Sequence, residues 1–380
     1  MSATEQRVAL VTNVLAHYRV ACFQQLNERL DQRLTIYLLA GDMQHRRYVL
    51  AEHGGELPVV TLPGWHWHQP PFDDRHINDV RPVLRDPSQT LILSAWDEPT
   101  YLLLWTWALL RRRKVIFWIE STAVDMPRGR AKEALKRLLL KKSAACMVPG
   151  QRAAAYCQQL GMSPQRIFTA PNAADRAFFR ARADRLLPQR DALRQSAGLE
   201  SFTVLFVGRL VEYYKGIETL ISASSKLEQR GIPATLALAG EGPDEARYRQ
   251  LAAEHSLGDV RFLGNLPHEE LCRTYATADV LVLPSVSETW GFVLNEAMEF
   301  GCPLIVSDRV GAGPDLVHPQ DNGFVFPAGD ADRLANALET LARDPRLRRR
   351  MGDASRRIVT EFSPSNWAAG ALEAIGAAGG

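Results

Sequence analysis

Short apolar runs alternate with longer amphipathic segments along the whole chain. In the first half these runs are RVALVTN, LTIYLLA, TLILSA, KVIFWIES, ACMVPG and RIFTAPN, and in the second half FTVLFVGR, ATLALAG, VRFLG, DVLVLPS, CPLIVS and GFVFPA. Such runs, separated by helix-length segments, predict buried parallel strands in βαβ units with helices on both faces of the sheet. The pattern restarts after a polar, arginine-rich stretch at 182–200. We therefore expect an α/β protein with two doubly wound, Rossmann-like domains.

The length of 380 residues also favours two domains over one core. We place an N-terminal, acceptor-binding domain at 1–185 and a C-terminal, donor-binding domain at 186–362. A last helix at 363–380 is expected to pack back toward the first domain. Because ligands of open α/β sheets bind beyond the carboxyl ends of the strands, we expect the domains to face a central cleft.

Charge is distributed unevenly between the two halves. Residues 1–190 carry 27 Lys+Arg and 17 Asp+Glu, whereas residues 191–380 carry 18 and 26, which together give the net charge of +2. Five cysteines without a C-x-x-C pair, and no apolar run at the start, indicate a reduced, cytoplasmic protein with neither zinc nor disulfides. The longest apolar run, at 101–110, is about half the length of a membrane span.

The stretch PSVSETWGFVLNEAMEFGCPLIVS at 284–307 combines an anion-binding geometry with two acids. A strand ends in SETWG, and a helix is expected from about Gly291 to Phe300. The start of this helix favours an anion. Glu288 and Glu296 flank that start, and carboxylates bind vicinal hydroxyls well. A ligand with phosphates between two polyols, such as a nucleotide sugar, fits both features.

A second strand-to-helix turn, FVGRLVEYYKG at 206–216, carries two cations. Arg209 and Lys215 would lie at the same sheet edge as SETWG and would converge there on a diphosphate. Taken alone, they could equally be solvated loop cations. Together with the two glutamates, the diphosphate interpretation is favoured.

These motifs, with LAGEGP and FLGNLPHEEL, resemble the donor half of the retaining family-4 glycosyltransferases, which have the GT-B fold. Glu288 and Glu296 match the E-x7-E element of that family. The resemblance covers residues 200–330 in order. The first half matches only through HYRV near its start and APNAAD before the connector.

The resemblance implies a role for each matching residue. Arg209 and Lys215 would stabilise the leaving nucleoside diphosphate, Glu296 would hold the ribose, and Glu288 would contact the transferred sugar. The catalytic residues implied or considered are Arg209, Lys215, Glu288 and Glu120. The expected donor-binding residues are Gly208, Arg209, Lys215, Leu263, Gly264, Leu266, Glu288, Thr289, Trp290, Gly291, Phe292 and Glu296.

The first half departs from the family pattern at two places. Many relatives have a glycine-rich loop after the first strand, where this chain has His17, Tyr18 and Arg19. Relatives often place a histidine after the strand that matches KVIFWIES, where this chain has Glu120. Glu120 would contact the sugar or the acceptor hydroxyl, or it is a carboxylate without a catalytic role. The expected acceptor-side residues are His17, Tyr18, Arg19, Asp97, Glu120 and Asn172.

Three further segments carry residue types that could bind a metal or an anionic partner. The Asp-x-Asp at 330–332 precedes a helix, and we interpret it as a helix cap. The histidine-rich segment GWHWHQPPFDDRH at 64–76 lacks a metal-ligand spacing, and we interpret it as a mobile loop near the acceptor. We therefore expect no metal and no cofactor. The helix at 127–145, with Leu135, Leu138 and Leu139 on its apolar side, is cationic. Its basic face is either simply solvated or attracted to an anionic membrane surface, and nucleic acid is not expected.

The sequence as a whole indicates a retaining, metal-independent hexosyltransferase. It would move a sugar from a nucleoside-diphosphate sugar, UDP being favoured over GDP, to a hydroxyl of a glycan, a lipid-linked glycan such as a polyprenyl diphosphate, or a small molecule. It would work in the cytoplasm, free or on the inner face of the cell membrane. Two alternatives remain: an epimerase or phosphorylase on the same fold, and a silent scaffold that binds nucleotide sugars.

Overall fold

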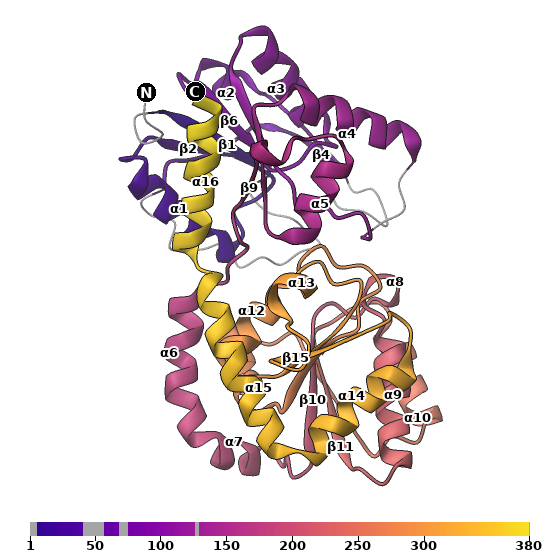
Figure 1. Cartoon of the computed structure of the whole chain (residues 1–380). Coiled ribbons are helices and arrows are strands. Elements are labelled where there is room, and N and C mark those ends of the chain that lie inside the picture. Colours follow the sequence, from indigo (N-terminus) through magenta and orange to yellow (C-terminus); the bar gives the residue numbers. More distant parts are fainter. Residues whose placement is uncertain (1–5, 41–56, 68–74, 126–128, 380) are drawn as a thin grey trace. The chain divides into compact units, whose positions relative to one another are not determined.

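The computed structural model describes residues 6–40, 57–67, 75–125 and 129–379, and the chain divides into two compact units (Figure 1). The first unit comprises Met1–Ser121, Arg128–Ala174 and Ser363–Gly380, and the second comprises Thr122–Pro127 and Asp175–Phe362. The division falls before helix α6 (Arg176–Leu186) rather than at the expected 185/186, because α6 packs against helices of the second unit.

The first unit contains a seven-stranded parallel sheet in the order β3-β2-β1-β6-β7-β8-β9. All six expected strands are present, and β3 is an addition at the edge. The strands are β1 (Val8–Thr12), β2 (Leu34–Leu38), β3 (Val59–Thr61), β6 (Thr90–Leu93), β7 (Lys114–Trp118), β8 (Ala145–Val148) and β9 (Ile167–Thr169).

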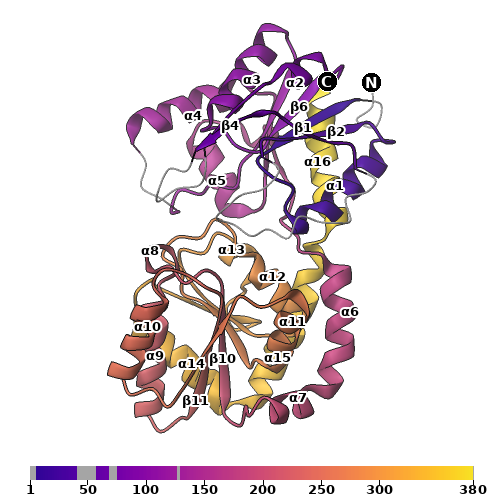
Figure 2. The ribbon, with the colours of Figure 1, turned by 180° about the vertical axis from the view of Figure 1, so that it is seen from behind.

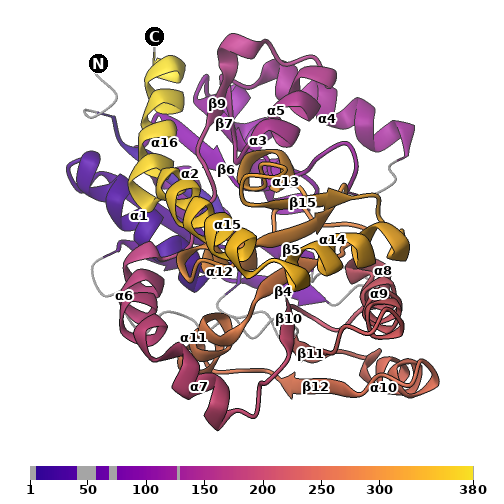
Figure 3. The same cartoon turned by 60° about the horizontal axis from the view of Figure 1, so that its bottom comes forward.

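Helices cover both faces of this sheet, as its apolar strands require. One core contains side chains of α1 and α16, and the other contains side chains of α2 to α5. Figure 3 shows α16 lying beside α1. The helices of the unit are α1 (His17–Arg29), α2 (Arg81–Arg85), α3 (Pro99–Leu110), α4 (Arg130–Lys142), α5 (Gln151–Gln159), η2 (Pro164–Arg166) and α16 (Pro364–Gly379).

Both ends of the histidine-rich segment form strands, so the expectation of a loop over 64–76 is wrong there. Strands β4 (Gly64–Trp67) and β5 (Arg75–Asn78) pair antiparallel, with Trp65 opposite Ile77. A Cβ at Gly64 would lie 2.5 Å from the carbonyl oxygen of Ile77, so this pairing needs glycine. Residues 68–74 of the segment lie outside the described residues.

The second unit has a six-stranded parallel sheet in the order β12-β11-β10-β13-β14-β15. All of its strands were expected from the apolar runs. The order reverses between β10 and β13, which is the topological switch point where such sheets bind ligands. The strands are β10 (Phe202–Val207), β11 (Ala234–Ala239), β12 (Asp259–Gly264), β13 (Val280–Leu283), β14 (Leu304–Ser307) and β15 (Gly323–Phe326).

Helices lie on both faces of the second sheet as well. Figures 1 and 2 show α9, α10 and α14 on one face and α6, α11, α12 and α15 on the other. The remaining helical segments are α7 (Arg190–Ser196), α8 (Glu212–Lys215), α9 (Ile217–Gln229), α10 (Glu245–Glu254), α11 (His268–Thr277), α12 (Phe292–Glu299), α13 (Gly313–Leu316), α14 (Ala331–Arg343), α15 (Pro345–Ile358), η3 (Leu187–Gln189) and η4 (Val359–Glu361). Among the helices of the described ranges, none has the length and apolar character needed to cross a membrane.

Candidate functional site

Two loops meet at the switch point of the second sheet. The carbonyl oxygen of Tyr214, in the short helix α8 that follows β10, accepts hydrogen bonds from the backbone N–H groups of Val286 (2.9 Å) and Ser287 (3.1 Å), in the loop after β13. Gly216 has φ of +61°, and a Cβ there would lie 2.5 Å from the carbonyl oxygen of Pro284. Only glycine allows this approach, so the sequence Y-K-G fixes the two loops together.

Two of the charged residues expected at this edge, Lys215 and Glu288, are brought together by these segments. The ammonium of Lys215 donates a hydrogen bond to Glu288 Oε2, and their side chains are only 19% and 17% exposed. Arg209, at the end of β10, is exposed and has no ion-pair partner among the residues that the structure describes. The edge therefore presents one neutralised pair and one accessible guanidinium.

The segment after Glu288 leads into helix α12, one residue shorter at each end than expected. Trp290 is 2% exposed, and its indole N–H donates to Asn295 Oδ1 at 2.9 Å, so its ring supports the loop from within. Thr289 is held through its neighbours, because the N–H of Gly311 donates to the Glu288 carbonyl and the N–H of Ala312 to the Trp290 carbonyl. Gly291 and Phe292 form the start of α12.

Glu296 lies on α12 and is buried, with 9% of its surface exposed. Burial raises the pKa of its carboxyl to about 7, against an opposing effect of the Tyr275 hydroxyl, which donates to Glu296 Oε2 at 2.7 Å. Tyr275 comes from α11 and was not singled out in the sequence. Its position fits the apolar face of a helix, and sequence spacing does not reveal that its hydroxyl faces α12.

The end of β12 lies at the same sheet edge as Gly208. The N–H of Gly208 donates to the Ala239 carbonyl (2.9 Å), and the N–H of Gly240 donates to the Gly264 carbonyl (2.7 Å). These bonds align the ends of β10, β11 and β12. Leu263, Gly264 and Leu266 are half-buried at this end.

In the first unit, three of the expected acceptor-side residues form one hydrogen-bonded group. The Arg19 guanidinium donates to Asn172 Oδ1 (2.8 Å) and to Glu120 Oε1, and the Asn172 amide donates to the same Glu120 oxygen (3.0 Å). The Arg19 side chain is 8% exposed and that of Glu120 32%. Glu120 is therefore held in one orientation, with part of its carboxylate accessible.

Aromatic rings pack against the Arg19 side chain of this hydrogen-bonded group. The Arg19 guanidinium lies 4.1 Å from the centre of the Trp118 ring, and Trp118 in turn packs on Trp367 of α16 at 5.2 Å. Residues of the last helix thus hold the group in place. The Arg19 guanidinium also lies 5.1 Å from the centre of the Tyr18 ring, and the His17 ring packs edge-on against that of Tyr18.

Asp97 is not joined to that group by any contact among the described residues. Its carboxylate accepts from Arg75 at 3.3 Å, which links it to strand β5. Its neighbour Glu98 is buried, with 4% of its surface exposed. The Glu98 carboxylate accepts a hydrogen bond from Asn13 Nδ2 (3.0 Å) and is hydrogen-bonded to His76 Nδ1 (2.8 Å). The Tyr101 hydroxyl in turn donates to Asn13 Oδ1. This buried network fills the switch point between β1 and β6.

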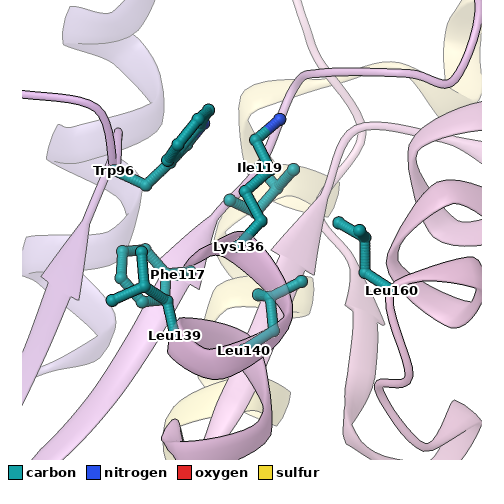
Figure 4. A pocket seen from close by; sticks show the side chains of 7 residues that line it. All are labelled: Trp96, Phe117, Ile119, Lys136, Leu139, Leu140 and Leu160. Atoms are coloured by element: carbon teal, nitrogen blue, oxygen red, sulfur yellow. The ribbon is translucent and has the colours of Figure 1, made fainter. Parts of the chain in front are cut away.

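Helix α4 differs from the sequence expectation in which residues it buries. Leu139 is buried, but Leu138 is 49% exposed, and Lys136 is 3% exposed. The Lys136 ammonium donates to the Tyr156 hydroxyl (3.0 Å) and lies 4.2 Å from the Trp96 ring. Figure 4 shows Lys136 rising beside Trp96 over a small hollow lined by Phe117, Ile119, Leu139, Leu140 and Leu160. The cation–π contact with Trp96 accounts for the burial of Lys136 on this helix, where the sequence led us to expect Leu138.

Asp330 caps helix α14, as the sequence predicts, because its carboxylate accepts from the N–H of Arg333 at 2.9 Å. Asp332 instead forms an ion pair with Lys226 at 2.7 Å. Within the described ranges, no group of three or more His, Cys, Asp or Glu residues has the arrangement of a metal site.

Residues 189–358 match the profile of the family described as "Glycosyl transferases group 1". This match lies within the second unit. The D-inositol 3-phosphate glycosyltransferase of Corynebacterium aurimucosum is 29% identical over 293 residues, which are 74% of this chain and 66% of that relative. The chain thus spans less than two thirds of the length of the curated relatives that it matches.

Solved structures show that the fold is GT-B. The structure of HepE from Anabaena in complex with UDP superposes with a TM-score of 0.73 at 17% identity, covering 96% of this chain and 97% of that one. The sucrose-phosphate synthase of Thermosynechococcus elongatus superposes with a TM-score of 0.68 at 23% identity, covering 94% of both chains. The expected fold, with two Rossmann-like domains, is confirmed.

Proposed function

We propose that this chain is a retaining glycosyltransferase that moves a hexosyl group from a nucleoside-diphosphate sugar to a hydroxyl group. The observation that carries the proposal is at the second switch point, where Lys215 pairs with Glu288 between two segments that are bonded to each other and the exposed Arg209 follows the end of β10. Glu296 lies eight residues beyond Glu288 on a rigid helix. Cations for a diphosphate and carboxylates for hydroxyls thus lie at one sheet edge.

Each residue has a distinct part in this proposal. Arg209 and Lys215 neutralise the diphosphate as negative charge develops on it, Glu296 accepts from the ribose hydroxyls, and Glu288 contacts the donor sugar while orienting Lys215. The start of α12, with Thr289, Trp290, Gly291 and Phe292, binds phosphate or sugar oxygens. Leu263, Gly264 and Leu266 flank the base. We favour UDP, which is also bound by HepE in its solved complex.

The transfer needs no protein nucleophile. The acceptor oxygen forms a bond to the anomeric carbon on the face where the bond to the phosphate oxygen breaks, and the leaving phosphate takes the acceptor proton. The protein contributes orientation and stabilisation of charge. Because Arg209 and Lys215 supply the positive charge, we propose that the reaction is metal-independent. Chelation with EDTA should then leave the rate unchanged.

On the acceptor side, we propose that Glu120 accepts a hydrogen bond from the acceptor hydroxyl or the donor sugar. Arg19 and Asn172 both donate hydrogen bonds to its carboxylate and hold it in place. His17, Tyr18 and Asp97 are proposed as outer contacts of the acceptor. A glycan, a lipid-linked glycan or a small molecule each offers the required hydroxyl.

The surface of α3 and α4 supports a peripheral location at an anionic membrane. Three leucines, Leu103, Leu110 and Leu138, are 53%, 80% and 49% exposed. Exposed basic residues lie on the same two helices or directly after them: Arg111, Arg112, Arg130, Lys132, Arg137, Lys141 and Lys142. Attraction to acidic headgroups is worth about 1 kcal/mol per basic residue at the surface. Flotation with vesicles containing phosphatidylglycerol, compared with neutral vesicles, tests this.

The central experiment measures thermal stabilisation by UDP, GDP, ADP, TDP and CMP, followed by transfer assays with the matching sugar donors. One nucleotide should raise Tm in the wild type but not in Glu296→Ala, because binding to the native state stabilises it by RT ln(1 + [L]/Kd). Retention is read from the anomeric configuration of the product by NMR. Release of an altered sugar without any acceptor would instead indicate an epimerase, and binding without turnover a scaffold.

A further inference from the structure

Tyr275 provides a hydroxyl group to a carboxylate that the proposed function assigns to ribose. Its hydroxyl donates to Glu296 Oε2 at 2.7 Å, and both side chains are buried. The two residues come from different helices, α11 and α12, 21 positions apart in sequence. A bond between separate helices fixes the carboxylate relative to the sheet edge, which α12 alone does not do.

The tyrosine itself is held rigidly. It is 0% exposed, its ring packs on Phe300 with 5.6 Å between centroids, and its carbonyl oxygen accepts from the Cys302 thiol at 3.5 Å. Phe300 and Cys302 lie between α12 and β14, so Tyr275 is clamped to the element that follows Glu296. A hydroxyl on such a ring has little freedom to follow a moving partner.

The bond leaves the carboxylate with capacity for a ligand. Each carboxylate oxygen accepts two hydrogen bonds, so Oε1 and one site on Oε2 stay available for two vicinal hydroxyls. We propose that Tyr275 is a positioning residue for donor recognition, which fixes Glu296 in the orientation that binds the ribose diol. This inference rests on the proposed function, because only there is Glu296 assigned to ribose.

The electrostatics of the site support this role. Burial raises the pKa of Glu296, whereas the bond from Tyr275 favours the ionised carboxylate, the better acceptor for hydroxyl groups. Burial raises the pKa of the Cys272 thiol, also on α11, to about 12, and the negative charge of Glu296 acts in the same direction. Tyr275 itself has a pKa well above its usual value, mainly through burial. Cys272 and Tyr275 therefore stay uncharged near neutral pH.

The test measures binding of UDP and of 2′,3′-dideoxy-UDP to the full chain by calorimetry. Wild type should bind UDP more tightly than the dideoxy nucleotide. Tyr275→Phe should weaken UDP binding by about threefold to tenfold, the range of one hydrogen bond, and leave dideoxy-UDP binding unchanged. Glu296→Gln should remove the same discrimination, and the double variant should lose no more than Glu296→Gln alone.

Tyr248 offers a matched control in the same unit. It is buried on α10, and its hydroxyl donates to the half-buried Glu212 carboxylate at 3.0 Å. Tyr248→Phe therefore removes an equivalent bond, and it should leave the ratio of UDP to dideoxy-UDP affinity at the wild-type value. This control separates positioning of Glu296 from a general loosening of the unit.

Three outcomes would overturn the inference, and they are distinguishable. If Tyr275→Phe weakens both nucleotides equally, its role is only structural. If Tyr275→Phe keeps the wild-type ratio of UDP to dideoxy-UDP affinity, then Glu296 is positioned without Tyr275, and the inference fails while the proposed function stands. If wild type binds neither nucleotide, or binds both with equal affinity, then the assignment of Glu296 to ribose fails and the inference fails with it.

Discussion

The two sheets have the same strand order around their switch points but use them differently. Between β10 and β13 of the second unit, the loops present an exposed Arg209 and the half-buried pair Lys215–Glu288. Between β1 and β6 of the first unit, the half-buried Asn13 and the buried Glu98, His76 and Tyr101 are joined by hydrogen bonds. The switch point of the second sheet therefore presents a charged side chain that a ligand can reach. At that of the first sheet, polar side chains are hydrogen-bonded to one another.

This difference shows that a shared topology does not make two equivalent sites. Polar groups that are buried and mutually bonded contribute to stability and specify one packing, whereas accessible charges are available for a ligand. In the first unit, Glu120 follows β7, one strand away from the switch point, and part of its carboxylate is accessible. Substitutions at the second switch point should therefore affect ligand binding, whereas substitutions in the buried network of the first should affect stability.

The largest effect is expected from removing both cations of the second switch point. Arg209→Ala with Lys215→Ala should lower kcat/KM for the sugar donor by about 10²–10⁴-fold, because two charge-assisted contacts of about 1.5–3 kcal/mol each are lost. The exposed pair Arg349→Ala with Arg350→Ala, on α15, removes the same charge and should have no such effect. Equal losses in the two variants would show that the diphosphate binds elsewhere.

Removing the buried acid of the first switch point should affect stability instead. Glu98→Ala removes the buried carboxylate that bonds Asn13 and His76, and we expect the free energy of unfolding in urea to fall by about 3 kcal/mol. Affinity for UDP should stay within about twofold of wild type. Glu28→Ala, at an exposed position of α1, is the control and should change stability by less than about 0.5 kcal/mol. A stable Glu98→Ala variant would contradict the assignment of this edge to stability.

A pH effect of similar size is expected at Glu296. Its pKa is raised from 4.5 to about 7 in the folded protein, so the folded state retains a proton that the unfolded state has lost between these values. The free energy of unfolding should therefore fall as pH rises from about 4.5 to 7, by about 3 kcal/mol, and level off above. The measurement is the difference in unfolding free energy between wild type and Glu296→Gln across pH 4.5–8. A difference that does not vary with pH would refute the raised pKa.

The smallest effect is expected on the acceptor side. Glu120→Gln keeps the shape of the side chain but removes its charge, and it should raise KM for the acceptor by about tenfold while leaving UDP affinity unchanged. Arg19→Lys, which loses the forked guanidinium between Glu120 and Asn172, should have a similar effect. Glu28→Gln serves as the matched control on α1. If both variants keep the wild-type KM, the accessible carboxylate of the first unit has no part in binding the acceptor.

Much of the second unit could be predicted from the chain because its signals are local. Apolar runs between helix-length segments gave all six strands, and Gly291, Gly301 and Pro303 bounded α12 within one residue. The positions of Arg209, Lys215 and Glu288 at one edge followed from their places at strand ends. In the first unit, Leu138 and the ends of the 64–76 segment were misjudged, because a leucine or a histidine carries no signal for which neighbour will cover it.

Linear pattern was therefore sufficient for the α/β architecture and for the set of charged loops, since hydrophobic periodicity and turn residues act over a few positions. Contacts between distant segments were decided only on folding. The bond from Tyr275 to Glu296, the contacts of Trp118 with Arg19 and with Trp367, and the bonds of Glu98 with Asn13 and His76 each join residues that are remote in sequence. Their geometry depends on how whole helices pack, because burial and hydrogen bonding at one residue are set by whatever the rest of the chain brings beside it.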